Sequence, residues 1–424
     1  MSVSRKIILI AFSFALPIAV LVYLMVINID DNVTFAQGEL KGDEYQRPLE
    51  ELLRDLQNEQ IALHTAELAG DDNGRIDLAF VRLAQVDRWL GADLQFTDSG
   101  LAKRHRSYER VANLQQEWSE LEKALANRAS TASHTDGPEK LDAKFNHLVS
   151  DVRTMITHMG DTSNLILDPD LDSYYLMDVT VLALPQTQDR LAQATLYGYE
   201  ALRRGAPTQA ERIQLAVYAA MLQQADVDRV AGSSRTSLNE DAGFYGTSVT
   251  LQRRLPAALL KYEEGNGPFI RVLNNLATGG PGVSPEAYLR NGLAARDASF
   301  SYWNTAVLEE DTLLHLRIAH FERRRTRSLL LAFASVLAAS LLAFRLTRSI
   351  TRPLLGLVAS RSPVAILLSV CAERISKASE NNFADRAEAA LICQELDANC
   401  DAMRKAVSEL ESQVKGVSSQ EARQ

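Results

Sequence analysis

An acidic run at positions 168–178 holds the residues whose types and spacing are best suited to chemistry. It reads Asp-Pro-Asp-Leu-Asp-Ser-Tyr-Tyr-Leu-Met-Asp, so carboxylates alternate at Asp168, Asp170 and Asp172. This spacing matches the first ligands of a calcium-binding loop, which also needs a glycine at its sixth position and a glutamate at its twelfth. Ser173 and Val179 occupy those two positions. The sequence therefore predicts no metal site, in this run or elsewhere, and no cofactor.

Helix capping explains the same carboxylates better than metal binding does. Pro169 would interrupt the preceding helix, and Asp170 or Asp172 would then cap the next helix and complement its dipole. The two tyrosines that follow would pack at the end of a helical bundle. The alternative is that these side chains contact a ligand, which makes four residues candidates for ligand binding: Asp170, Asp172, Tyr174 and Tyr175.

Motifs for catalysis are otherwise missing from the sequence. It contains no Ser/His/Asp constellation, P-loop or glycine-rich nucleotide loop. His315 and His320 are five residues apart, whereas the helical zinc motif places two histidines four residues apart. We expect a protein that is not an enzyme, and catalysis by the three aspartates of the acidic run is the alternative.

The elements that position these residues are predicted to be long helices. Apolar residues recur in alternating steps of four and three, and this average period of 3.5 forms a narrow seam along which helices pack. One such stripe comprises Leu141, Phe145, Leu148, Val152, Met155 and Met159. Loop sequences at 71–74, 136–138, 205–208 and 279–282 separate the stripes, and Ser284 before Pro285 predicts a helix N-terminus. The fold class is all-α, with either two stacked four-helix bundles or one bundle of long, broken helices.

Two apolar stretches, at positions 7–27 and 329–344, flank this helical segment. Each approaches the roughly 20 residues that a helix needs to cross a bilayer. Cys371, Cys393 and Cys400 all follow the second stretch, which favours a reducing compartment for the C-terminal part. Basic residues before the first stretch and after the second also favour cytoplasmic termini, although an arginine cluster at 323–327 opposes this orientation. A cleaved signal peptide is the alternative for the first stretch, whose apolar core is longer than usual.

These observations predict a multi-pass protein of the bacterial inner membrane, with lipid around its two spans. The formal net charge of -9 argues against nucleic acid as a partner. The predicted segments are a cytoplasmic N-terminus at 1–6, a transmembrane helix at 7–28, a periplasmic helical domain at 29–327, a second transmembrane helix at 328–346, a cytoplasmic helical segment at 347–411 and a polar tail at 412–424.

Two motifs carry a resemblance to a known family. The first is Phe-Ala-Gln-Gly-Glu-Leu-Lys-Gly at 35–42, followed by Tyr-Gln-Arg-Pro-Leu at 45–49. The second is Leu-Asp-Pro-Asp-Leu-Asp-Ser-Tyr-Tyr-Leu-Met-Asp at 167–178. Behind an N-terminal anchor, this combination resembles the periplasmic sensing region of bacterial methyl-accepting chemotaxis proteins and related membrane histidine kinases. The resemblance covers most of residues 1–355 and implies a homodimeric receptor for a small periplasmic ligand or a periplasmic protein.

After the second apolar stretch, Arg-Ser-Ile-Thr-Arg-Pro-Leu at 348–354 is similar to the entry of a HAMP linker. In that family, two short helices per chain form a dimeric four-helix bundle that converts motion of the membrane helix into a change of output. The resemblance makes Arg352, Pro353 and Leu354 the expected signal-coupling residues. The sequence departs from the family by an insertion at 360–370 and by Asn381-Asn382-Phe383 where a glycine is usual, so this segment is a degenerate HAMP-like region.

The resemblance implies a sensor that detects a periplasmic ligand or partner and passes a helix displacement to a separate cytoplasmic signalling protein. Chemoreceptors and kinases continue into an output module, and the segment after the second apolar stretch is too short to hold one. Two alternatives therefore stay open: a truncated, non-signalling receptor remnant, and a structural or interaction membrane protein that binds no ligand. The sequence does not identify the ligand, because pockets in bundles are built from scattered side chains on facing helices.

Overall fold

The computed structural model describes residues 3–65, 73–130 and 138–380, with short helical stretches between 391 and 412. Helices make up all the regular secondary structure of these residues, and no strand occurs among them. The all-α prediction is therefore confirmed. The helical period of the apolar residues explains the result, because the stripe that begins at Leu141 and ends at Met159 is buried along its whole length.

Two compact units share the long helices α1 (Val3–His64) and α11 (Pro285–Glu380). One unit comprises Met1–Val26 and Thr326–Gln424, and the other comprises Ile27–Arg325. Both helices contain a stretch that is long and apolar enough to cross a membrane, within Ala15–His64 and Pro285–Arg345. In the first unit, apolar side chains such as Leu21 and Phe333 are 66% and 69% exposed, which is the exposure that lipid-facing residues need.

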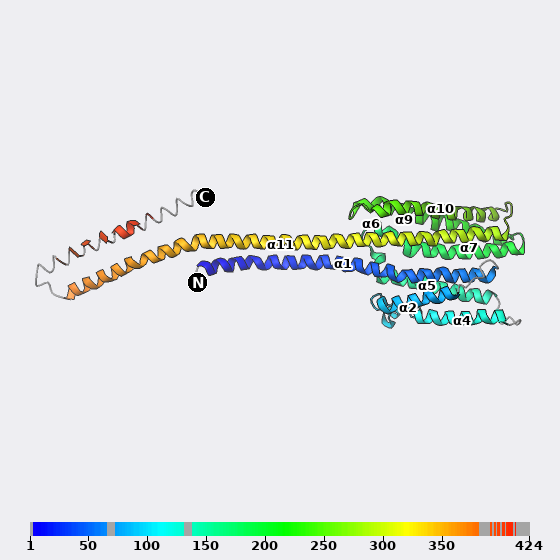
Figure 1. Ribbon diagram of the computed structural model, residues 1–424, viewed down its shortest axis with the longest axis horizontal. Helices are drawn as coiled ribbons and strands as arrows, with labels where there is room; N and C mark the ends of the chain where they lie inside the picture. The colour runs from blue at the N-terminus through cyan, green and yellow to red at the C-terminus, as the bar shows by residue number, and fades with distance from the viewer. Residues whose placement is uncertain are drawn as a thin grey trace. The chain divides into compact units, whose positions relative to one another are not determined.

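Within the unit Ile27–Arg325, four helices form a first bundle (Figure 1). They are the C-terminal part of α1, α2 (Asn73–Leu90), α4 (Val111–Ser130) and α5 (Pro138–Thr162), and the short α3 (Asp98–Lys103) lies between α2 and α4 in the chain. Their apolar stripes face inward and share one core, whose largest side chains include Tyr45, Phe80, Trp118 and Phe145.

A second bundle in the same unit begins at α6 (Leu171–Met177). It contains α7 (Leu184–Arg204), α8 (Gln209–Ala220), α9 (Asp228–Glu240), α10 (Val249–Ala277) and part of α11. Two π-helical turns, η2 (Asp178–Ala183) and η3 (Met221–Val227), join the α-helices, and the 3-10 turns η1 (Leu165–Leu167) and η4 (Asp241–Gly243) precede α6 and α10. The core of this bundle includes Tyr262, Phe269, Tyr288 and Trp303.

The two bundles lie side by side, and α1 and α11 run along the boundary between them (Figure 1). Ile61 of α1 packs in the core of the second bundle, and Phe300 of α11 packs in the core of the first. The structure therefore has two bundles, but their cores lie beside each other rather than end to end. The two helices at the boundary are also the two helices that carry the apolar stretches.

The start of α11 lies where the sequence predicts it. The backbone N–H of Ala287 donates a hydrogen bond to Ser284 Oγ at 3.2 Å, so Ser284 caps the helix and Pro285 is its first residue.

Beyond the second apolar stretch, α11 continues as one helix to Glu380. The expected coupling residues Arg352, Pro353 and Leu354 lie within it, and their side chains lie outside the described part of the structure. The predicted connector at 381–383, Cys393 and the tail from 413 also lie outside the described residues.

Candidate functional site: a buried polar seam

Polar residues occupy core positions on both helices at the boundary between the bundles. In each helix these positions follow one another in alternating steps of three and four, as the core positions of a packed helix pair do. We call this set the polar seam, and each of its side chains is at most 4% exposed. Its polar members are Glu39, Asp43, Gln46, Glu50 and Gln57 on α1 and Arg296, Ser299, Glu310 and Arg317 on α11. The apolar residues Leu53, Trp303, Ala306 and Leu313 occupy the remaining positions of the same spacing.

Arg317 lies at one end of the seam and contacts three carboxylates. Its Nη1 donates to Glu39 Oε2 at 2.7 Å, and its Nη2 donates to Asp168 Oδ1 at 2.5 Å. Its Nε lies 2.5 Å from Asp170 Oδ2, and its Nη2 also donates to Ser173 Oγ at 2.5 Å. One buried guanidinium therefore joins α1, α11 and the acidic run that starts α6.

A second group of carboxyls lies next to this cluster on the same two helices. Arg47 of α1 donates to Asp311 of α11. Asp43 and Glu310 are fully buried beside this pair, and Glu310 Oε2 accepts a hydrogen bond from Thr180 Oγ1 at 2.7 Å. Carboxyls outnumber arginines here, so the cluster would carry a large negative charge if every group were ionised.

Burial shifts the protonation of these carboxyls strongly toward the neutral form. It raises the pKa of Glu39 to about 9, with help from the neighbouring Asp168 and against the attraction of Arg317. Burial likewise raises the pKa of Asp43 and of Glu310 well above the usual value, and each of them also faces other carboxylates. The pKa of Asp172 rises to about 6, first because of burial. Several carboxyls of the seam therefore hold a proton near neutral pH.

The middle of the seam depends on the π-helical turn η2. A π-turn shifts the helical hydrogen-bond ladder and leaves backbone groups available to other partners. Thr180 lies in this turn, and its backbone oxygen accepts from Gln46 Nε2 of α1 at 2.7 Å and from Trp303 Nε1 of α11 at 3.0 Å. A single carbonyl therefore joins both boundary helices.

Arg296 lies at the other end of the seam and differs from Arg317 in its partners. Its Nη1 donates to Asn58 Oδ1 at 3.0 Å, and its Nη2 donates to Gln57 Oε1 at 3.2 Å. Its guanidinium also lies over the ring of Phe300, 5.8 Å from the ring centroid. Burial lowers the pKa of Arg296 to about 10. Its hydrogen bonds to described side chains go to amide oxygens.

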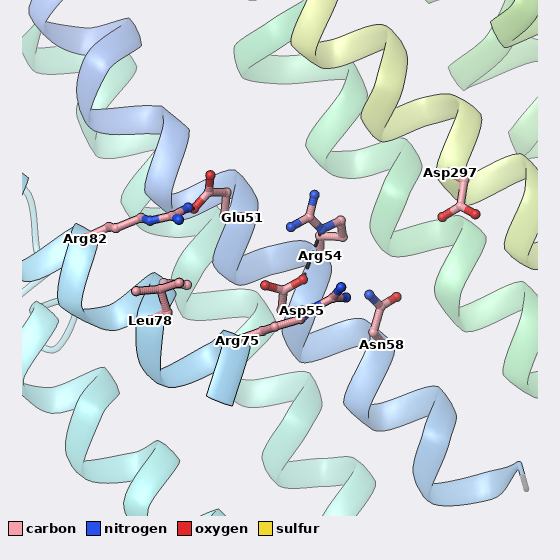
Figure 2. Close-up of a pocket in the computed structure, with 9 residues that line it drawn as sticks. Glu51, Arg54, Asp55, Asn58, Arg75, Leu78, Arg82 and Asp297 are labelled. Atoms are coloured by element: carbon pink, nitrogen blue, oxygen red, sulfur yellow. Dashed lines mark hydrogen bonds and ion pairs between the residues drawn. The ribbon is translucent and has the colours of Figure 1, made fainter. Parts of the chain in front are cut away.

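A surface pocket of about 430 Å³ lies beside this end of the seam, between α1, α2 and α11 (Figure 2). Figure 2 shows Arg75 and Arg82 of α2 pointing toward α1, where Arg82 Nη1 donates to Glu51 Oε2 at 2.6 Å. Arg54 Nε of α1 donates to Asp55 Oδ1 at 3.0 Å. The lining residues are Glu51, Arg54, Asp55, Asn58, Arg75, Leu78, Ala79, Arg82 and Asp297. Three arginines and three carboxylates line the pocket, so its surface is strongly polar.

The predicted site residues divide into two groups. Asp170 stands at the N-cap position of α6, but its side chain makes no capping hydrogen bond and contacts Arg317 instead. Asp172 Oδ1 accepts from the backbone N–H of Ser173 at 2.9 Å. Tyr174 and Tyr175 contact each other edge to face at 5.5 Å, and neither donates to a residue of the seam. The structure thus brings Asp170 into contact with the seam, whereas Asp172 lies only within electrostatic range of Arg317.

Sequence reasoning missed four buried charged residues of the seam, of which Arg317 contacts the acidic run directly. They are Glu39, Asp43, Glu310 and Arg317. The signal that identifies them is a charged residue at a position that continues the three–four spacing of a buried stripe, as Glu39 and Asp43 do ahead of Leu53.

No family model matches this sequence, and no curated protein matches it. Among solved structures, the chain is similar to the structure of the NasR transcription antiterminator, with 14% identity and a TM-score of 0.42. That similarity covers 96% of this chain and 99% of the other. A likeness at this level assigns neither a family nor an activity to the chain.

Proposed function

We propose that this chain is a membrane-bound, chemoreceptor-like sensor of the bacterial inner membrane, with residues 29–327 in the periplasm and both termini in the cytoplasm. In this proposal a small polar solute, or a periplasmic protein, shifts α11 along α1. The segment after the second span is a HAMP-like region that passes the displacement to a separate cytoplasmic signalling protein. The working form is a homodimer, as in the receptors that the sequence resembles.

The observation that carries the proposal is the set of contacts between the two helices that also hold the apolar stretches. Arg47 pairs with Asp311, Arg317 with Glu39, and Arg325 with Asp30 at 2.6 Å. Residue numbers rise along one helix as they fall along the other, so the helices are antiparallel. Polar groups buried between helices fix the axial register, because a shifted register leaves them without partners.

Because buried polar contacts fix the axial register of α11 against α1, only a few other registers are stable. A switch needs such a small number of discrete states. Sliding α11 along α1 takes Arg317 away from Glu39 and from Asp168, so intermediate positions leave buried charge unpaired. Helix shifts of about 1–2 Å at such interfaces are an established mode of switching. The pocket beside Arg54 and Asp297 is lined by both helices, so a solute that binds there favours one register over another.

The experiment that tests the proposal measures the axial position of α11 against α1 in the full chain in lipid nanodiscs. Spin labels are attached to cysteines that replace Glu44 on α1 and Leu308 on α11, both of which are exposed. The native cysteines are first replaced by serine, and the distance between the labels is measured by double electron–electron resonance. We compare the parent chain with Arg317→Met and with the conservative Arg317→Lys.

We expect Arg317→Met to shift the distance distribution by about 1–2 Å and Arg317→Lys to stay closer to the parent. Arg324→Met removes an exposed arginine of the same helix and serves as the control. Identical distributions in all four chains would refute a register set by the polar seam.

A second measurement distinguishes a ligand-binding sensor from a structural membrane protein that binds no ligand. A solute that binds only the native state raises the melting temperature of the chain. We expect at least one small polar solute in a screen to stabilise the full-length protein, and substitution of Asp297 in the pocket by asparagine to reduce that effect. A screen without any stabilising solute favours the structural alternative.

A further inference from the structure

Away from the polar seam, α4 and α5 bring one histidine and two carboxylates together. His147 and Asp151 lie four residues apart on α5 and therefore project from one face of that helix, while Glu117 reaches them from α4. His147 Nδ1 lies 3.4 Å from Glu117 Oε2 and 3.2 Å from Asp151 Oδ2. The three ligand atoms all lie within 4.8 Å of one another.

These separations are those of ligands that share a tetrahedral ion. Zinc binds imidazole nitrogen and carboxylate oxygen at about 2.0–2.2 Å, which places two ligands of one tetrahedron about 3.3–3.6 Å apart. Both distances from His147 Nδ1 lie near that range, and the 3.4 Å distance to Glu117 exceeds the length usual for an N–H···O hydrogen bond. The side chain of Glu117 is 36% exposed, so a small rotation of this side chain can bring its carboxylate oxygen closer to Asp151.

The oxygens at this position are also poorly satisfied by the protein itself. Asp151 Oδ2 is buried without a hydrogen-bond partner, and so is Glu109 Oε2 nearby. Glu117 and Asp151 both lie beside the His147 imidazole, and a divalent cation would neutralise their combined negative charge.

We propose that Glu117, His147 and Asp151 bind a divalent transition-metal ion of the zinc class and leave one coordination position for water. A mixed nitrogen and oxygen donor set favours Zn²⁺, Cu²⁺ or Ni²⁺ over Mg²⁺ and Ca²⁺, which prefer oxygen donors alone. The ion cross-links α4 to α5 within the first bundle. This site lies outside the acidic run, where the sequence predicts no metal, and it uses a histidine–carboxylate pair rather than the histidine pair that the sequence lacks.

The test is a Zn²⁺ titration of the full-length, tag-free protein in detergent micelles after treatment with a chelator. Serines replace Cys371, Cys393 and Cys400 in every sample, so that thiolates do not contribute. Competition with a chromophoric chelator gives the stoichiometry and affinity for this parent and for His147→Ala and Asp151→Asn. The matched control is Glu120→Gln, which removes an exposed carboxylate one turn along α4.

We expect His147→Ala to bind one equivalent of Zn²⁺ fewer than the parent and Asp151→Asn to bind it about tenfold or more weakly. Glu120→Gln should match the parent. Co²⁺ in place of Zn²⁺ should give the intense visible bands of a tetrahedral complex in the parent and lose them in His147→Ala. No saturable binding by the parent, or equal binding by the parent and His147→Ala, would overturn the proposal. Because the His147 side chain is 64% exposed, loss of folding does not account for a loss of binding, and circular dichroism verifies this.

Discussion

Arg317 of α11 donates a hydrogen bond from Nη1 to Glu39 Oε2 of α1 at 2.7 Å, and both side chains are buried. Each of these helices also contains a stretch that is apolar enough to cross a membrane. A polar contact inside a bundle core costs free energy to form, and its value lies in specifying one alignment of the helices.

Replacing Arg317 with methionine should destabilise the unit Ile27–Arg325 by about 3–5 kcal/mol, because Asp168 and Asp170 then remain buried without their cation. The loss of unfolding free energy should be larger at pH 9 than at pH 6. At the lower pH, protonation of the buried carboxyls around position 317 removes part of the unpaired charge. Chemical denaturation of the detergent-solubilised protein, followed by circular dichroism, measures the change. Arg324→Met on the exposed face of α11 should cost less than 0.5 kcal/mol, or about one-tenth as much. Equal losses for both variants would contradict the account.

Stability should fall as pH rises from about 5 to 9. The folded-state pKa is about 9 for Glu39 and about 8 for Glu50, against an ordinary value of 4.5. Between the unfolded-state pKa of 4.5 and the folded-state pKa, the folded chain holds protons that the unfolded chain has released. The stabilisation that these protons provide is therefore complete below pH 4.5 and is lost as pH rises through the folded-state pKa. Each such proton contributes a slope of about 1.4 kcal/mol per pH unit. His158 acts in the opposite sense, because burial lowers its pKa.

Glu50→Gln isolates one of these protons. The amide resembles the protonated carboxyl, so the variant should match the wild-type stability near pH 6 and lose less stability than wild type by pH 9. Melting temperatures measured at pH 6, 7.5 and 9 test this. Glu51→Gln, which removes a half-exposed carboxylate paired with Arg82, is the matched control and should keep the wild-type slope. A wild-type slope in Glu50→Gln would show that this carboxyl is ionised in the folded state.

His64 should titrate above the usual histidine value. Its Nε2 lies 2.8 Å from Asp142 Oδ1 and its Nδ1 lies 2.9 Å from Glu200 Oε1. Two carboxylate acceptors require N–H groups on both nitrogens, which is the charged form, and the pKa of His64 is raised chiefly by Asp142. NMR titration of the imidazole should show this, and Asp142→Asn should lower the pKa. Asp161→Asn removes a carboxylate that pairs with Arg106 instead and should leave the titration unchanged.

Two glycines in helices should respond oppositely to alanine. A Cβ at Gly198 of α7 would lie 2.1 Å from Tyr288 Oη, and that hydroxyl donates to the backbone oxygen of Ala194 at 2.7 Å. Gly198→Ala should therefore destabilise the second bundle by about 1–3 kcal/mol. A Cβ at Gly232 of α9 meets nothing within 4 Å, so Gly232→Ala should stabilise it by about 0.5–1 kcal/mol. Thermal unfolding of the two variants tests the close packing of α7 on α11, and equal effects would exclude it.

The helices and the apolar cores were predictable because their signal is local. Leu141, Phe145 and Leu148 are buried in the first bundle as their spacing requires. The side-by-side placement of the two bundles was not predictable, since apolar stripes have the same spacing whichever way bundles are joined. The π-turn that holds Thr180 also has no sequence signal of its own.

The polar seam escaped prediction for a different physical reason. A search for stripes of apolar residues passes over Glu39 and Glu310, although both continue a core spacing. The partner of Asp170 is Arg317, on a helix far along the chain, so no local pattern joins them. Capping of α6 was a sound expectation for Asp170 by position, but the buried guanidinium is a stronger partner for its carboxylate.

The central claim is that α1 and α11 each cross the membrane and hold the unit Ile27–Arg325 outside the cytoplasm. Labelling of single cysteines on intact spheroplasts with a membrane-impermeant maleimide tests it most directly. Ser150→Cys, at an exposed position of α5, should react at once in a chain without other cysteines, and Cys393 as the single cysteine should react only after permeabilisation. The opposite pattern, with Cys393 accessible and position 150 protected, would contradict the account.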